Sequence, residues 1–289
     1  MSSNREYTIT ARNQIVGTSI NGMLSLINYY HYAKQYRNCW INLNLDGVNF
    51  IDANLSAFLY SIVYDLKNNF GVSTFIDFKS IGKDLNVLMR NGFTNHVAGN
   101  GYQFKPYDER DTTIPLMVFN QKNVDDYCDY IERDFLHQRG LRNIRFNDKD
   151  RIIASYIEIF ENVGLHANTN DPVFVCGQYF PKQGELKFTL VDLGDGFLKK
   201  IAEYTKGDEN ITTASDAIHW AIAGHSTKIG APGGTGLRDI FRFCTQTGGS
   251  LHIMSDDCYY NLTNTTTHTY KLLKQYKGAT IHLIFRFLL

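Results

Sequence analysis

Strand-like and helix-like patterns alternate through the first part of the chain, and this alternation is the strongest constraint on its fold. Residues 38–48 and 72–78 have the composition of strands. Each is followed by a segment with apolar residues at helical spacing, 52–71 and 82–93, which ends at or beside a glycine, a common helix terminator. This order predicts an α/β domain in which helices pack on a parallel or mixed sheet.

A different order follows in the second part of the chain. Two helices are predicted at 124–141 and 148–168, after a strand at 113–119. Further strands are expected at 173–180, 186–192, 251–255 and 279–289. Helices followed by strands that pair locally predict an α+β sandwich, with the helices on one face of a mixed sheet.

The length of the chain and one polar stretch predict two domains. A chain of 289 residues suits two domains of ordinary size. Residues 99–113, GNGYQFKPYDERDTT, are polar and contain glycine and proline, which is typical of a linker. We therefore predict one domain over residues 1–108 and a second over residues 109–289.

The composition argues against several classes of function. Lys and Arg number 29, as do Asp and Glu, so the net charge is zero and no broad electrostatic attraction to nucleic acid or an anionic membrane is expected. The start of the chain lacks a secretion signal, and no run approaches the ~18 apolar residues of a membrane helix. The five cysteines have no metal-ligand spacing, which predicts free thiols and a cytoplasmic protein.

Three polar residues form one stripe of the helix predicted at 148–168. Glu158, Asn162 and His166 are spaced four apart, and the neighbouring stripe is apolar and should face the sheet. A carboxylate can orient a water molecule, and an amide oxygen can bind Mg²⁺. The alternative is a solvated flank with hydrogen bonds between successive turns, and the helix alone favours that alternative.

The stretch VDLGDGF, residues 191–197, places polar residues directly after a strand-like run. Asp192 ends the strand, and Gly194 and Gly196 remove side chains where a flat ligand can approach the backbone. A dinucleotide fingerprint would need glycine at Lys199, and a calcium loop would need ligands where the glycines stand. The alternative is an ordinary turn.

A glycine-rich stretch, GHSTKIGAPGGTGLRDI at residues 224–240, precedes a predicted helix. Backbone N–H groups exposed at the start of a helix bind phosphate. A Walker A loop needs Lys-Ser/Thr after its last glycine, whereas this chain has Leu237-Arg238. Phosphate binding here would therefore differ from that of a P-loop, and the alternative is a flexible glycine loop.

In this order, the three stretches resemble the ATP-binding domain of the GHKL superfamily, which includes gyrase, histidine kinases and MutL. The resemblance covers about residues 113–289 and implies a Bergerat-type fold that binds ATP and Mg²⁺. It implies that Glu158 is the catalytic carboxylate that polarises the attacking water and that Asn162 holds Mg²⁺. Asp192 would accept a hydrogen bond from the adenine amino group, and Thr280 would help to hold adenine through water. His166 matches a position that is often basic.

The same resemblance assigns roles to the glycine-rich segments. Gly194 and Gly196 would make room for the nucleotide, and residues 197–232 would form a lid that closes over ATP. Lys228 lies in a stretch similar to one of the MutL group and would reach a phosphate. The residues expected to surround the phosphates are Gly233, Gly234, Thr235, Gly236 and Leu237.

The first domain resembles STAS domains, the fold of anti-sigma-factor antagonists, on the stretch LNLDGVNFIDANLSAFLYSI. STAS domains usually carry Asp-Ser-Ser/Thr-Gly at the turn before the helix, where this chain has Asp52-Ala53-Asn54-Leu55. Asn54 stands in the place of the phosphorylated residue, and Ser56 falls within the helix. The resemblance implies a regulatory domain that binds a protein partner, without the usual phosphorylated residue.

Three functions follow from these resemblances. The first is a slow Mg²⁺-dependent ATPase or ATP-driven switch, and the retained Glu158 favours it. The second is a serine/threonine kinase of the anti-sigma-factor type, although the missing acceptor at Asn54 counts against it. The third is a scaffold that binds ATP without hydrolysing it. A homodimer and a place in bacterial signalling would fit the resemblance, and nucleic acid is not an expected partner.

Overall fold

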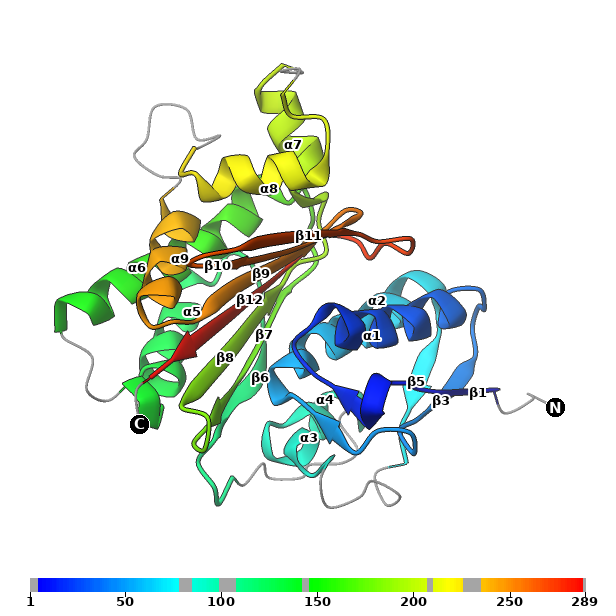
Figure 1. Ribbon diagram of the computed structural model, residues 1–289. Coiled ribbons are helices and arrows are strands. Elements are labelled where there is room, and N and C mark those ends of the chain that lie inside the picture. The colour runs from blue at the N-terminus through cyan, green and yellow to red at the C-terminus, as the bar shows by residue number, and fades with distance from the viewer. Residues whose placement is uncertain are drawn as a thin grey trace. The chain divides into compact units, whose positions relative to one another are not determined.

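The computed structural model describes residues 5–77, 85–98, 108–141, 146–206, 210–225 and 235–287, without the side chains of 140, 146–148 and 166. The chain divides into two compact units, which are described separately (Figure 1). The first contains Met1–Met117 together with Cys176–Gln178. The second contains Val118–Val175 and Tyr179–Leu289.

The first unit is built on a parallel sheet, in agreement with the alternation of strand and helix patterns. Strands β1 (Arg5–Thr8), β3 (Trp40–Asn44) and β5 (Ser73–Phe75) lie in the order β1-β3-β5, and both pairs are parallel. A second, short parallel pair joins β2 (Ile15–Val16) to β4 (Phe50–Ile51). The helices of this unit are α1 (Ile20–Ala33), α2 (Ser56–Phe70), α3 (Val87–Arg90) and α4 (Phe93–Ala98), with 3₁₀ turns at Arg12–Gln14 and Ala53–Leu55.

Helix α2 ends at the glycine that the sequence predicts, whereas no bounds were predicted for α1. Ser19 caps α1 by accepting a hydrogen bond from the Gly22 N–H. Gly71 ends α2 with a φ of 67°, a left-handed conformation that glycine adopts without a steric penalty. The aromatic face of α1 packs into the core, where the Tyr29 hydroxyl lies 2.6 Å from Thr74 Oγ1.

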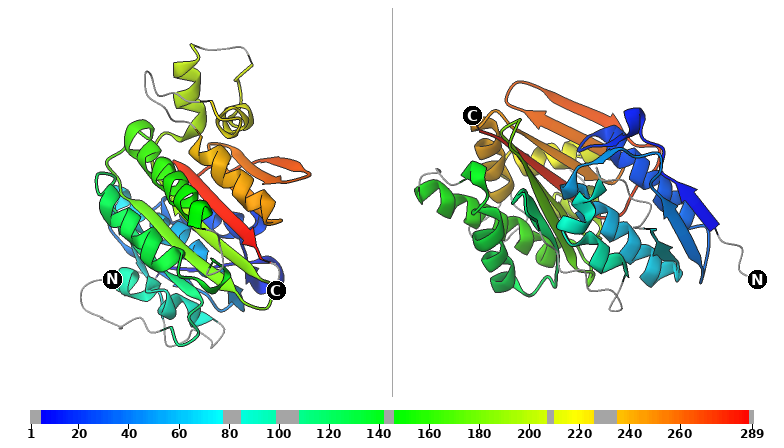
Figure 2. Two further views of the ribbon diagram at one scale, coloured as in Figure 1. Left: turned by 90° about the vertical axis from the view of Figure 1, so that its left-hand side faces the viewer. Right: turned by 90° about the horizontal axis from the view of Figure 1, so that it is seen from below.

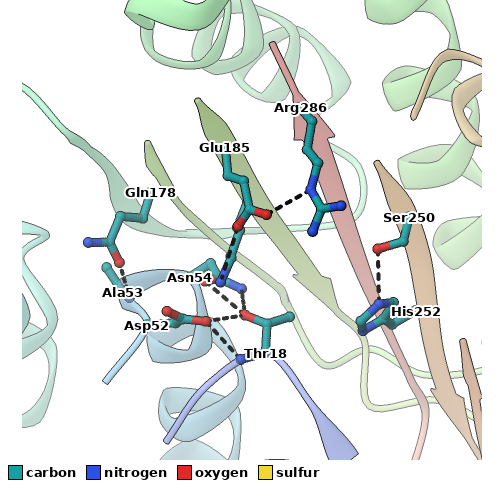
Figure 3. A network of polar contacts seen from close by, with 10 residues as sticks. Thr18, Asp52, Ala53, Asn54, Gln178, Glu185, Ser250, His252 and Arg286 are labelled. Carbon is teal, nitrogen blue, oxygen red and sulfur yellow. Dashed lines mark hydrogen bonds and ion pairs between the residues drawn. The ribbon is translucent and has the colours of Figure 1, made fainter. Parts of the chain in front are cut away.

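The turn that precedes α2 is held by buried polar contacts (Figure 3). One carboxylate oxygen of Asp52 accepts hydrogen bonds from the Thr18 backbone N–H at 2.7 Å and from its hydroxyl at 2.8 Å. The Asn54 amide donates to the same hydroxyl at 3.0 Å. Asn54 and Ser56 are fully buried, so neither side chain is exposed to a modifying enzyme.

Most of a seven-stranded sheet in the order β11-β10-β9-β12-β8-β7-β6 belongs to the second unit, although residues 113–117 and 176–178 of this sheet are grouped with the first unit. The four pairs that link β8, β12, β9, β10 and β11 are antiparallel. The sequence predicts a mixed sheet and misses β10 and β11, which follow β9 through tight turns that force antiparallel pairing. The strands are β6 (Thr113–Phe119), β7 (Val173–Phe180), β8 (Glu185–Val191), β9 (Ser250–Ser255), β10 (Cys258–Thr263), β11 (Thr267–Lys271) and β12 (Ala279–Arg286).

Helices α5 (Val124–Tyr130), α6 (Phe146–His166) and α9 (Gly236–Gln246) lie on one face of this sheet, as predicted (Figures 1 and 2). α5 continues into a π-helical turn at Ile131–Phe135, followed by a 3₁₀ turn at Arg139–Leu141. Aromatic rings fill the layer between helices and sheet. Tyr127 of α5 stacks on Phe160 of α6 at 4.2 Å between ring centroids, and Tyr156 of α6 meets Phe188 of β8 edge to face.

Two further helices, α7 (Gly196–Tyr204) and α8 (Ala214–Ile222), lie beyond one end of the sheet (Figure 1). The resemblance implied a lid in this region, but its helices were not predicted from the sequence. Ile201, Ile211 and Ala217 form a small core between them, separate from the main core. Across the ranges that the structure describes, no helix combines the length and the apolar character needed to cross a bilayer.

Candidate functional site

A cavity of about 860 Å³, including its open mouth, lies where α6, α7, α8 and the start of α9 meet the ends of β8 and β12. All of its lining residues belong to the second unit. Its walls are mainly apolar, and its polar side chains are few: Asn162, Asp192, Lys200 and His225. The apolar lining consists of Ile159, Val163, Ala167, Phe197, Ile201, Trp220, Ala221, Leu237, Ala279 and Ile281.

The fold brings the three sequence stretches to this one place. Asn162 of α6, Asp192 after β8 and Leu237 of α9 line the same cavity, although they are far apart in the sequence. Glu158 is one turn before Asn162 and lies against the first residue of α9. A β-carbon added to Gly236 would stand 2.8 Å from Glu158 Cβ and 3.0 Å from its Oε2.

Asp192 is the buried acid of the cavity, with a side chain exposed to only 6%. The last four residues of β8 are buried, and Asp192 follows them directly. The end of this strand therefore places the acid in the cavity wall. One carboxylate oxygen accepts a hydrogen bond from the Gly194 N–H at 2.8 Å. The pKa of Asp192 is raised to about 6. Burial is the main cause and outweighs the backbone hydrogen bonds from Gly194 and Ala279, which lower the pKa. Asp192 is therefore an acid that titrates close to neutral pH.

The two glycines after Asp192 are explained by packing within the protein. A β-carbon on Gly194 would meet the Ala167 carbonyl oxygen at 2.1 Å. A β-carbon on Gly196, whose φ is 77°, would meet Ser255 Oγ at 2.7 Å. The position that a β-carbon would take at each glycine is thus occupied by other atoms of the protein, although Gly196 also lines the cavity. This differs from our expectation that both glycines make room for a ligand.

Residues at the β9–β10 turn accept hydrogen bonds from the start of α7. Ser255 Oγ accepts from the Phe197 N–H at 3.0 Å, and Asp256 accepts from the Leu198 N–H at 3.3 Å. These contacts satisfy two of the four backbone donors that a helix leaves free in its first turn. An anion is therefore not expected at this helix end.

Thr280 is placed differently from the sequence-based expectation. Its neighbours Ala279 and Ile281 line the cavity, whereas Thr280 is not in the lining. Successive residues of a strand point to opposite faces, so the Thr280 side chain belongs to the other face of β12. It is buried, and its hydroxyl has no hydrogen-bond partner among the described residues. The cavity residues of this stretch are Ala279 and Ile281.

Several predicted site residues cannot be placed. Lys228, Gly233 and Gly234 lie outside the described residues, as does the side chain of His166. Thr235 is described, and it precedes α9 without a hydrogen bond from its side chain to the helix. Its carbonyl oxygen accepts from the Asp239 N–H at 2.7 Å.

The lid helices contribute residues that the sequence analysis misses. Phe197, Lys200 and Ile201 enter the cavity from α7, and Trp220 and His225 enter it from α8 and the residues after it. The signal was present in the sequence. AIHWAI (217–222) and FLKKIAEY (197–204) both carry apolar residues at helical spacing, but the segment 197–232 was assigned to a lid by resemblance and no helices were predicted in it.

Arg238 brings a cation to the start of α9. Its guanidinium packs over Gly224, where an added β-carbon would stand 2.6 Å from Nη1. Its Nε lies 3.6 Å from Asp239, a contact too long for a hydrogen bond. Gly224 precedes His225 of the cavity lining, so the positive charge stands close to the cavity mouth.

The described residues contain no cluster of three or more His, Cys, Asp or Glu side chains that would hold a metal on its own. The five cysteines, all within the described ranges, form no disulfide. The cavity thus has the chemistry to take a flat, partly apolar ligand that donates a hydrogen bond to Asp192. Comparison with protein-family models, with curated proteins and with solved structures gives no match.

Proposed function

We propose that the second unit is a GHKL-type, Bergerat-fold ATP-binding domain, and that the protein is a slow Mg²⁺-dependent ATPase or ATP-driven switch. One observation carries this proposal. Asn162, Asp192 and Leu237 come from the three stretches that resemble the superfamily, and all three line one cavity. If these three stretches only packed together in the hydrophobic core, side chains would be expected to fill the space between them and no cavity would remain.

The adenine end of the ligand is assigned to Asp192. Its carboxylate can accept a hydrogen bond from an exocyclic amino group, and the apolar walls suit the faces of the ring. Because Asp192 is buried, a ligand without this donor would leave the carboxylate with only its backbone hydrogen bonds from Gly194 and Ala279. Adenine is therefore favoured over a base that presents a carbonyl oxygen at this position.

The residues present fit a Mg²⁺ ion that is held mainly by phosphates. Mg²⁺ usually keeps several waters and takes only one or two protein oxygens in nucleotide sites. Asn162 supplies an amide oxygen in the cavity wall, and no larger group of ligands stands among the described residues. When bound, Mg²⁺ would neutralise the charge of the phosphates.

Glu158 is assigned to the attacking water. It lies one helical turn from Asn162, on the same stripe of α6, and against the first residue of α9. A carboxylate here can accept a proton from water that approaches the terminal phosphate. Among the described residues no side chain caps the start of α9, so its first backbone N–H groups can bind the phosphates.

The first unit is proposed as a STAS-like domain that binds a protein partner. Its three parallel strands and the buried turn before α2 support this reading. A kinase that modifies its own turn is disfavoured, because Ser56 is buried and accepts a hydrogen bond from Asn91 at 2.8 Å. Phosphate transfer to a separate partner protein remains a distinct outcome of the test.

The test is phosphate release from Mg·ATP, with ATP binding measured by calorimetry on the same proteins. We compare the wild type with Glu158→Ala and with Glu161→Ala. Glu161 directly precedes Asn162 on α6 but does not belong to the stripe of Glu158, Asn162 and His166, so it serves as the control. Turnover should disappear in Glu158→Ala, while binding persists in both variants. Absence of ATP binding by the wild type would refute the proposal, and binding without release or transfer would reduce it to a scaffold.

A further inference from the structure

Trp220 is the largest aromatic side chain in the cavity wall. It comes from α8, whereas Asp192 comes from the end of β8, so the two reach the cavity from different elements. Its indole stacks on the His225 ring, with centroids 5.0 Å apart and planes at 29°. Tyr204 approaches it at 6.1 Å and 60°. Trp220 thus belongs to an aromatic group that borders the cavity.

The packing of Trp220 leaves it between core and cavity. It packs against the small core of Ile201, Ile211 and Ala217, which fixes the helix that carries it. The residue itself is only partly buried, and it lines the cavity beside Ala221 and His225. A tryptophan that served only the small core would be expected to lie within it.

Aromatic side chains bind flat heterocycles through their faces. Stacking of a base on an aromatic ring tolerates different bases but increases with the area of overlap. A cavity with a buried hydrogen-bond acceptor and an aromatic wall therefore selects a ligand by two separate features. Asp192 selects an amino group, and the aromatic wall selects a large flat ring.

We infer that Trp220 is a specificity-determining residue that contacts the base, so that the site prefers purine to pyrimidine nucleotides. This inference rests on the proposed nucleotide-binding function. Adenine and cytosine both carry an exocyclic amino group, so both can use Asp192. Only the two-ring base has the larger face, and a difference between ATP and CTP therefore reports on Trp220 and not on Asp192.

The experiment measures ATP and CTP binding by calorimetry for the wild type, Trp220→Phe and Trp220→Leu. Leucine keeps an apolar side chain in the small core but removes the ring. ATP binding should weaken about tenfold or more in Trp220→Leu and far less in Trp220→Phe. The ratio of ATP to CTP affinity should shrink in Trp220→Leu, which a purely structural role would not cause.

A second measurement leaves Trp220 unchanged. The sequence contains two tryptophans, and Trp40 belongs to the first unit. In Trp40→Phe protein, Trp220 is the only indole fluorophore, and its emission should change in a saturable manner as ATP is added. Trp40→Phe should bind ATP as the wild type does, which makes it the matched control.

The outcomes separate the two proposals. If the wild type binds no ATP, the proposed function fails, and this inference fails with it. If the wild type binds ATP but Trp220→Leu retains both the affinity and the ATP-to-CTP ratio, only the role of Trp220 is overturned. Unchanged Trp220 emission at saturating ATP would overturn that role even if Trp220→Leu did not fold.

Discussion

Gly236, the first residue of α9, packs so closely on Glu158 of α6 that a β-carbon there would lie 2.8 Å from Glu158 Cβ. Real β-carbons do not approach other atoms this closely, so any other residue would push the two helices apart or turn the carboxylate away. The contact joins a glycine of one sequence stretch to the acid of another. It also explains why the helix starts with glycine, a poor helix former.

Gly236→Ala should therefore destabilise the protein by about 1–3 kcal/mol and reduce ATP turnover by displacing Glu158. Gly164→Ala is the matched control on α6. Its β-carbon would have ordinary contacts, with the nearest atom at 3.7 Å, and alanine should stabilise the helix by about 0.5–1 kcal/mol. Urea unfolding of both variants checks the opposite signs, and equal effects would show that the Gly236 contact is not tight.

The raised pKa of Asp192 predicts how stability depends on pH. Between its usual pKa of 3.8 and its folded pKa of about 6, the folded protein holds a proton that the unfolded chain has lost. Stability from this group therefore falls as pH rises through this window and is constant above it. The two pKa values correspond to about 3 kcal/mol of unfolding free energy.

Urea unfolding of wild type and Asp192→Asn at pH values from 4 to 7 checks this prediction. Other carboxylates contribute to both proteins, so they cancel in the difference between the two unfolding free energies. The wild type should lose stability relative to Asp192→Asn as pH rises from 4 to 6. If the difference between the two unfolding free energies is constant across this range, the pKa of Asp192 is not raised in the folded protein.

Sequence patterns predicted a parallel or mixed sheet in the first unit, helices close to the observed α2 and α6, and the helical layer on the second sheet, because these depend on local periodicity. Residue 71 illustrates this, since a left-handed terminator can be inferred from the glycine alone. The side to which Thr280 points could not be inferred. It depends on which residues of β12 pair with β8 and β9, and a shift of one residue reverses the face.

The packing contacts that require glycine after Asp192 could not be predicted from the sequence either. Gly194 is required by the Ala167 carbonyl at the end of α6, a contact between residues that only the fold brings together. Trp220 and His225 were missed for a similar reason. Both lie in the segment 197–232 that the resemblance assigned to a lid, and the helix α8 that carries Trp220 was not predicted there.

Asn162→Ala should abolish the Mg²⁺ dependence of ATP binding if its amide oxygen holds the ion. The expected loss of affinity in Mg²⁺ is about 1–3 kcal/mol, as for removal of one buried polar partner. Calorimetry with ATP in Mg²⁺ and in chelator checks this. In chelator the variant and the wild type should bind alike, and persistent Mg²⁺ dependence in the variant would make Asn162 a structural residue.

Closure of the lid helices over ATP predicts protection from trypsin. Lys199 and Lys200 lie in α7 and Lys206 follows it, and α7 is held mainly by its small core with α8. At ten times the dissociation constant, a ligand that binds only the closed form lowers the open population about elevenfold. Cutting at these lysines should therefore slow about tenfold with a non-hydrolysable ATP analogue, as followed by mass spectrometry. Cutting after the exposed Arg37 of the first unit should not change, and equal protection at both places would indicate a global effect and not lid closure.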